Sequence, residues 1–100
     1  MLAGGRVFTG VNVENASYPL GMCAERNAVG AAVTAGERRL DCVAVVTAAA
    51  QPTPPCGGCR QVLWEFGPES LVVSESTDGV RVMWALEDLL PDAFGPPSLR

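Results

Sequence analysis

Two short clusters of reactive side chains, each at the start of a predicted helix, constrain this chain more than any other feature. The first cluster is Cys23-Ala24-Glu25-Arg26, and the second is Pro55-Cys56-Gly57-Gly58-Cys59. The start of a helix carries a partial positive charge, which favours the ionised thiolate that binds metals. A fold that uses these sulfur atoms together must therefore bring two helix starts side by side.

The cysteines predict a zinc site. The chain contains no histidine, so such a site must use thiolates or carboxylates. Cys56 and Cys59 have the spacing of two ligands on a turn that opens a helix, and Cys23 could supply the third. Zinc prefers four tetrahedral ligands, and a catalytic site leaves one position to water. Glu25, two residues after Cys23, is placed to move protons beside that water.

The charge of such a site predicts a neighbouring cation. Three thiolates around a dication leave a net negative charge, which weakens the metal as a Lewis acid. A cation that donates hydrogen bonds to sulfur would restore part of that acidity. Arg26, beside Glu25, is the first candidate for this role, and Arg60, directly after Cys59, is the second.

Two other interpretations of the cysteines stay open. A single Cys-x-x-Cys pair is also typical of a redox site, and Cys42 could complete a structural zinc site with four cysteines. Cys42 begins a predicted apolar strand, which favours a place in the core. The carboxylate beside Cys23 and the proline before Cys56 favour a catalytic site.

The pattern of apolar residues predicts an α/β fold with a partly parallel sheet. Strands are expected over 6–13, 42–48, 71–74 and 80–83, and the continuous apolar run of 42–48 predicts a strand buried on both faces. Helices are expected over 23–35, 57–66 and 86–90, with Gly36 ending the first and a loop over 15–21 leading into it. One hundred residues without an internal linker predict a single domain, 1–100.

The composition excludes several classes of partner. The net charge is −4 and the seven arginines are scattered, so no basic face is available for nucleic acid. The longest apolar run is too short to span a bilayer, and no signal-peptide pattern is present. We therefore expect a cytoplasmic protein that binds neither nucleic acid nor membrane and acts on a small substrate. The 48% hydrophobic content is high for a small monomer and hints at partner subunits.

Four motifs, in order and at fitting spacing over 1–94, resemble cytidine deaminase of the homotetrameric three-cysteine type. The motifs are Asn12-Val13-Glu14-Asn15-Ala16-Ser17-Tyr18, Cys23-Ala24-Glu25-Arg26, Pro55-Cys56-Gly57-Gly58-Cys59-Arg60-Gln61-Val62-Leu63 and Leu89-Leu90-Pro91-Asp92-Ala93-Phe94. A ligand-x-Glu followed by Pro-Cys-x-x-Cys is the general signature of zinc deaminases. The resemblance implies a three-layer α/β/α fold with a mixed sheet, a Zn²⁺ cofactor and a homo-oligomer, either a tetramer or a dimer.

The resemblance also implies roles for the residues of the metal site. Cys23, Cys56 and Cys59 would bind zinc, Glu25 would be the proton shuttle, and Arg26 would donate hydrogen bonds to the thiolates. The implied reaction is hydrolytic deamination of cytidine and deoxycytidine to uridine and deoxyuridine, with release of ammonia, in pyrimidine salvage.

Further residues would bind the nucleoside. Asn12 and Glu14 would hold the ribose hydroxyls, the backbone N–H of Ala24 would contact the pyrimidine carbonyl, and Phe94 would stack on the base in a neighbouring subunit. Outside this resemblance, Asn12 and Glu14 are equally typical of an exposed strand end, and Phe94 of a hydrophobic plug at the end of a chain.

The chain departs from the family pattern at its start. The family usually begins with a helix and a strand, and 1–3 look like the tail of that strand. We therefore expect an N-terminally truncated fold whose sheet lacks backbone partners where the strand is missing. Two alternatives follow: a non-catalytic, zinc-stabilised remnant of a deaminase, or a deaminase of another aminopyrimidine nucleoside, against which the Asn12 and Glu14 pair argues.

Overall fold

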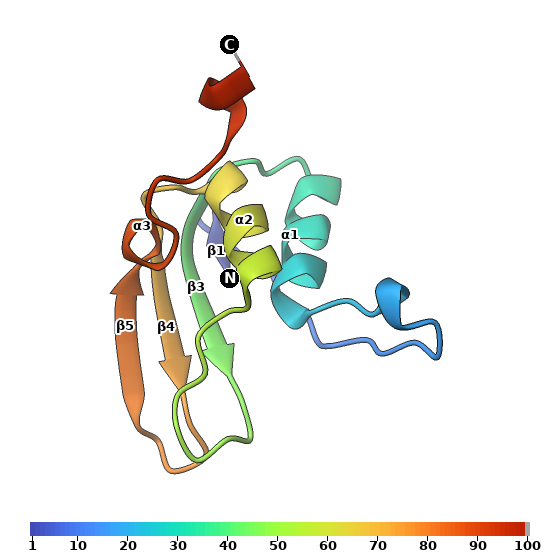
Figure 1. Cartoon of the computed structure of the whole chain (residues 1–100), viewed down its shortest axis with the longest axis vertical. Coiled ribbons are helices and arrows are strands. Elements are labelled where there is room, and N and C mark those ends of the chain that lie inside the picture. Colours follow the sequence, from blue (N-terminus) through green and yellow to red (C-terminus); the bar gives the residue numbers. More distant parts are fainter. Residues whose placement is uncertain (100) are drawn as a thin grey trace.

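The computed structural model describes residues 1–99, which form a five-stranded mixed sheet and three α-helices (Figure 1). The strands run in the order β2-β1-β3-β4-β5, and β3 and β4 are parallel while the other neighbours are antiparallel. The predicted α/β class with a mixed sheet is confirmed. The strands are β1 (Leu2–Ala3), β2 (Arg6–Val7), β3 (Leu40–Val46), β4 (Leu71–Glu75) and β5 (Arg81–Ala85).

The helices form close to where the sequence predicts them. They are α1 (Ala24–Thr34), α2 (Gly57–Phe66) and α3 (Leu86–Leu89), with short 3-10 helices η1 (Tyr18–Leu20) and η2 (Pro96–Leu99). Helix α1 is followed by Gly36, whose φ of 90° lies in the left-handed region that suits glycine after a helix. None of the helices within residues 1–99 is long and apolar enough to cross a membrane.

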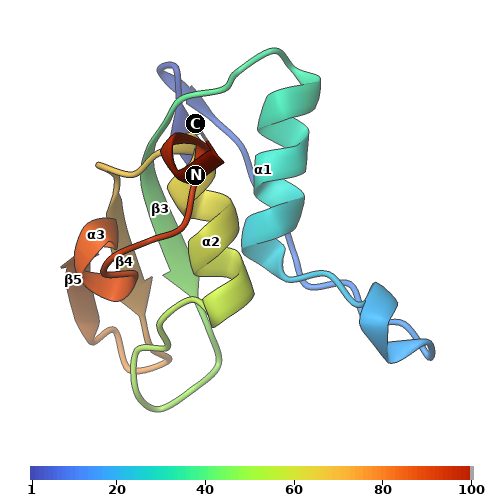
Figure 2. The same cartoon turned by 45° about the horizontal axis from the view of Figure 1, so that its top comes forward.

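The hydrophobic core lies between the sheet and its helices. Helices α1 and α2 lie side by side over one face, as both views show, and α3 packs against α2 and β5 (Figures 1 and 2). At the centre, Leu63 of α2 meets Val72 of β4, and both are fully buried. The buried core residues are Val29, Leu40, Val43, Leu63, Val72 and Leu86.

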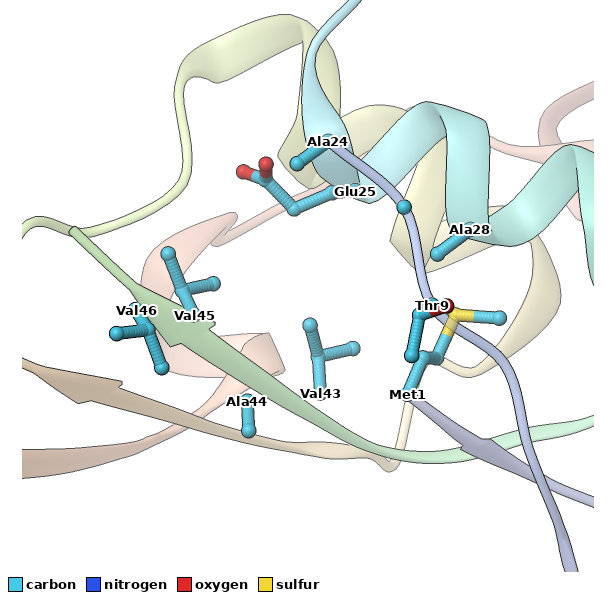
Figure 3. A pocket seen from close by; sticks show the side chains of 10 residues that line it. Met1, Thr9, Ala24, Glu25, Ala28, Val43, Ala44, Val45 and Val46 are labelled. Atoms are coloured by element: carbon cyan, nitrogen blue, oxygen red, sulfur yellow. The ribbon is translucent and has the colours of Figure 1, made fainter. Parts of the chain in front are cut away.

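The opposite face of the sheet is not covered by a helix from residues 1–99. Side chains alternate along β3, so Val43 and Val45 point toward α1 whereas Ala44 and Val46 point away from it (Figure 3). Val46 is 75% exposed and Met83 of β5 is 62% exposed. The predicted burial of 42–48 on both faces is therefore wrong for the chain as described, because its helices form one layer only.

The predicted strand over 6–13 is also wrong beyond Val7. Phe8 and Met1 still exchange backbone hydrogen bonds of 2.8 Å, but the chain then leaves the sheet. At Gly10 it passes against the backbone of α1 so closely that a Cβ would lie 2.6 Å from the nitrogen of Ala28. This approach to the helix, which regular alternation does not encode, ends the strand.

Residues 11–22, which we call the arm, project away from the sheet and helices (Figures 1 and 2). A single antiparallel bridge between Val13 and Met22 holds the two sides of the arm together, and η1 forms its tip within the predicted loop. Asn27 of α1 anchors the base by donating from Nδ2 to the carbonyl of Val11, at 2.7 Å.

The two-residue β1 lies where the sequence predicts the tail of a strand, at 1–3. It pairs with β3 only at Leu40 and Cys42, through an irregular register. Val43 to Val46 consequently have β4 on one side and no strand from residues 1–99 on the other. That open side of β3 lines a cavity of about 220 Å³ beneath the start of α1.

Two glycine-to-alanine substitutions test the close contact beneath α1. Gly10→Ala places a methyl group against backbone atoms that cannot rotate away, so we expect a loss of about 1–3 kcal/mol in the free energy of unfolding. Gly30→Ala, on the exposed side of the same helix with open space around it, should instead gain about 0.5–1 kcal/mol. Urea denaturation of both variants measures the difference, and equal stabilities would contradict the described path of the chain.

Candidate metal centre and substrate pocket

Three cysteine sulfur atoms come together where α1 and α2 begin. Cys23 and Cys56 are the residues that precede the first turn of α1 and α2, and Cys59 is in the first turn of α2. The three Sγ atoms lie within 4.8 Å of one another, and those of Cys23 and Cys56 are 3.9 Å apart. The two helix starts are thus brought together as predicted.

The arrangement of the sulfur atoms fits a tetrahedral zinc ion. A zinc–sulfur bond of about 2.3 Å in tetrahedral geometry separates two sulfurs by about 3.8 Å, which agrees with the 3.9 Å between Cys23 and Cys56. No fourth acidic or cysteine side chain belongs to this cluster among residues 1–99. Cys42 lies apart on β3, so the four-cysteine alternative is wrong for the described structure.

The surroundings of Cys56 and Cys59 shift the pKa values of these two thiols in opposite directions. Burial raises the pKa of the Cys59 thiol, and its neighbours Cys56 and Cys23 raise it further. The backbone N–H of Cys59, which faces the start of α2, lowers the pKa of the Cys56 thiol. The exposed member of the Cys-x-x-Cys pair therefore ionises before the buried one.

Arg26 lies beside the cluster, as the charge argument predicts. Its interaction with Cys23 raises the pKa of the guanidinium, and the sulfurs of Cys59 and Cys56 act in the same direction. The guanidinium is held by donation from Nη2 to the carbonyl of Gly21, at 3.2 Å. Its Nε is buried without a hydrogen-bond partner in the described part of the chain, so Arg26 retains donor capacity next to the thiolates.

Arg60, the second candidate for that role, contacts carbonyl groups instead. Its Nε donates to Pro55 at 2.8 Å and its Nη1 donates to Leu89 at 2.9 Å. Of the two arginines, Arg26 is the one whose guanidinium pKa is raised by the cysteines of the cluster.

A buried hydroxyl holds the loop that leads to Cys56. Ser74 of β4 is fully buried and donates to the carbonyl of Thr53 at 2.7 Å. The hydroxyls of Thr47 and Thr53 also lie 3.2 Å apart across this loop. Pro55 is fully buried at its end, so the turn that carries Cys56 is fixed from both sides.

Glu25 lies between the metal cluster and the cavity along β3. Its carboxylate projects from the first turn of α1 toward Val45 and Val46 (Figure 3). An adjoining pocket of about 520 Å³ is lined by Cys23, Glu25 and Cys56 together with Asn12. That volume is in the range of about 300–1,000 Å³ typical of sites for small molecules.

Two of the predicted substrate-binding groups bond to each other in this structure. Asn12 Oδ1 accepts a hydrogen bond of 2.7 Å from the backbone N–H of Ala24. The contact satisfies one of the free N–H groups at the start of α1. Asn12 and Ala24 thus lie in the same pocket as Glu25.

The other two predicted residues lie outside that pocket. Glu14 is exposed on the arm, and Phe94 is 61% exposed beyond α3. The carbonyl of Phe94 accepts a hydrogen bond of 2.7 Å from Gln61 on the side of α2. Within one chain, therefore, Phe94 does not face Glu25.

Gly10 is the residue of this region whose importance the sequence reasoning missed. It lines both the cavity along β3 and the pocket beside Glu25, and its missing side chain lets the chain pass α1. A glycine inside an otherwise strand-like pattern is a known signal of close backbone approach. That signal was available in the sequence.

Comparison with known proteins identifies the family. The model of the cytidine and deoxycytidylate deaminase zinc-binding region matches residues 2–75. The chain is 47% identical over 95 residues to a cytidine deaminase of Mycobacterium tuberculosis, covering 95% of this chain and 68% of that protein. It is 41% identical over 95 residues to that of Halalkalibacterium halodurans, covering 94% of this chain and 72% of that protein.

A solved structure shows the same arrangement of elements. The crystal structure of cytidine deaminase from Burkholderia pseudomallei is similar with a TM-score of 0.88 and 46% identity, covering 93% of this chain and 76% of that chain. The family model and the three-cysteine cluster together make Zn²⁺ the cofactor. The chain therefore belongs to the cytidine and deoxycytidylate deaminase family.

Proposed function

We propose that this protein catalyses the zinc-dependent hydrolytic deamination of cytidine and deoxycytidine to uridine and deoxyuridine, releasing ammonia, in pyrimidine salvage. The observation that carries the proposal is one pocket lined by Glu25, Cys23 and Cys56, in a chain that belongs to a deaminase family. Curated relatives covering most of this chain are named cytidine deaminase.

In this proposal Cys23, Cys56 and Cys59 hold the zinc ion. When bound, zinc supplies a Lewis acid that lowers the pKa of a coordinated water to about 7. Glu25 would take one proton from the water and deliver it to ring nitrogen N3 while the hydroxyl adds to the amine-bearing carbon. Glu25 would then take the remaining proton of that hydroxyl and give it to the amine, which leaves as ammonia as the carbonyl forms. Arg26 balances the thiolate charge, and its buried Nε supports this role.

Asn12 and Ala24 bind the nucleoside after their mutual hydrogen bond opens. A pyrimidine carbonyl takes the N–H of Ala24, which frees the Asn12 side chain for a ribose hydroxyl. The 2.7 Å bond between them supports this exchange, because it places both groups at one edge of the pocket. Glu14, on the arm, is the second ribose ligand.

We further propose that the chain works as a homo-oligomer, a tetramer or a dimer. The arm exposes apolar side chains that a monomer leaves in water: Val11 is 71% exposed, Tyr18 is 89% exposed and Leu20 is 66% exposed. Phe94, which does not face the pocket of its own chain, then stacks on the base in a neighbouring subunit. Its 61% exposure supports such a contact.

We place the protein in the cytoplasm and treat 1–100 as a single domain. The three cysteines of the proposed metal site are free thiols, and a reducing compartment keeps thiols in that state. One continuous core from Val29 to Leu86 supports a single folding unit. The absence of a basic face disfavours a nucleic-acid substrate.

Removing one proposed ligand should remove the metal. Cys56→Ser is expected to lower the zinc content from about one ion per chain to a small fraction of that, since it leaves two thiolates. Cys42→Ser, outside the cluster, is the matched control and should keep its zinc. Atomic emission analysis of the purified proteins measures the content. Full zinc occupancy in Cys56→Ser would exclude Cys56 as a ligand.

Replacing the carboxylate of Glu25 should stop turnover without releasing zinc. We expect Glu25→Gln to lower kcat for cytidine by roughly 10²–10⁴-fold, because the amide cannot accept the proton. Loss of the ultraviolet absorbance of cytidine measures the rate, with zinc content determined in parallel. A zinc-loaded wild-type chain that leaves cytidine unchanged would favour a non-catalytic module, and activity on another aminopyrimidine nucleoside alone would favour the other alternative.

Mixing two defective variants should restore activity if Phe94 acts in a neighbouring subunit. Phe94→Ala is expected to lower kcat/KM about ten-fold through lost stacking. In oligomers refolded from equal amounts of Phe94→Ala and Glu25→Gln, about a quarter of the sites combine intact Glu25 and Phe94 from different chains. The mixture should therefore exceed the mean kcat/KM of the two separate variants. Activity equal to that mean would exclude a site shared between chains.

A further inference from the structure

The guanidinium group of Arg60 connects the turn that carries Cys56, which we call the metal turn, to the C-terminal part of the chain. Two different nitrogens of Arg60 donate to two carbonyls that are far apart in sequence: Nε to Pro55 and Nη1 to Leu89. Pro55 directly precedes Cys56 and is fully buried. Leu89 ends α3 and begins the segment that carries Phe94.

Gln61, the next residue of α2, and Trp64, one turn beyond Arg60, hold the same segment at a second and a third point. Gln61 donates from Nε2 to the carbonyl of Phe94 at 2.7 Å. Gly95 is buried, and a Cβ added there would lie 3.1 Å from Nε1 of Trp64, so the indole packs directly against this glycine. Residues 89–95, which we call the strap, are thus held along one side of α2.

The opposite side of α2 belongs to the metal centre and the core. Cys59 and Leu63 are both fully buried on it. The helix therefore carries a metal-site cysteine on one side and the strap on the other, within little more than one turn. A displacement of its first turn moves both.

We propose that Arg60 and Gln61 are positioning residues that fix the Phe94 ring relative to the metal centre through the strap. This inference rests on the proposed function, in which Phe94 stacks on the base bound by a neighbouring subunit. Arg60 sets the start of the strap and braces the turn of Cys56. Gln61 sets the backbone of Phe94 itself and does not touch the metal turn.

The geometry of the Arg60 contacts requires a guanidinium and not merely a positive charge. Its planar, forked donors reach two carbonyls in different directions at 2.8 Å and 2.9 Å. A lysine ammonium at this position would keep the charge but would lose the rigid fork. Arg60→Lys therefore separates bridging from simple charge balance beside the metal.

The first experiment compares Arg60→Lys with Arg81→Lys in zinc-loaded protein. Arg81 is exposed on β5 and pairs with Glu75, so the same substitution there is the matched control. Arg60→Lys should speed the transfer of zinc to a chromogenic chelator about ten-fold, since its support of the Cys56 turn is lost. In a Trp84→Phe background it should also shift the emission of Trp64 to longer wavelength. Wild-type values in both measurements would overturn the bridging role.

The second experiment separates the strap from the metal with Gln61→Ala. We expect KM for cytidine to rise about five-fold with kcat and zinc release unchanged, because one hydrogen bond that orients a binding group is lost. The emission of Trp64 should shift as in Arg60→Lys. Glu65→Ala, an exposed position on the same helix, is the control. An unchanged KM, or a fall in kcat alone, would overturn the role of Gln61.

The two proposals can fail separately. Zinc transfer and Trp64 emission require no turnover, so they test the connection between strap and metal turn even in a chain without deaminase activity. If wild-type protein deaminates cytidine but Gln61→Ala retains its KM, the positioning proposal fails and the proposed function stands. If Arg60→Lys does not fold, Gln61→Ala still decides.

Discussion

The structure is organised around three thiol groups gathered at the starts of two helices. Three thiol groups within 4.8 Å of one another would repel once ionised, and a divalent cation held by them would instead link α1 to α2. Both helices direct the positive end of their dipole at the cluster, which lowers the cost of gathering thiolates there. In a chain of 100 residues with a modest core, a metal bound there would add to the stability that the core gives the helix pair.

The sheet in turn positions the loop that carries Cys56 and the side of β3 that lies near Glu25. The parallel pair β3 and β4 ends near the loop that carries Cys56, and Ser74 ties that loop to β4. On the side away from β4, the two-residue β1 does not reach Val45 and Val46, so the carboxylate of Glu25 faces that side of β3 across a cavity. The packing that holds the cysteines in place thus leaves space beside the carboxylate of Glu25.

The helices and the cluster could be predicted because their signals are local. Apolar spacing, a following glycine and cysteines just before the first turn define α1 and α2 within a few residues of the chain. The failed predictions concern contacts between distant parts. The strand over 6–13 ends because Gly10 meets the backbone of Ala28, and Arg60 turns from sulfur to a carbonyl 29 residues away. Periodicity cannot reveal such contacts, nor whether a second layer covers Val46, since they arise only when the elements pack.

Helix α2 connects the cysteine cluster to the strap through consecutive residues of one rigid element. The start of α2 presents Cys59 to the cluster and, at the next two positions, Arg60 and Gln61 to the strap. Adjacent residues on a helix point about 100° apart, so one rigid element serves two surfaces at once. In the proposed bridge, a displacement of the metal turn would also move the strap, because the Arg60 side chain donates to both. In an assembly where each strap serves a neighbour, the metal of one subunit would then help to order the pocket of the next.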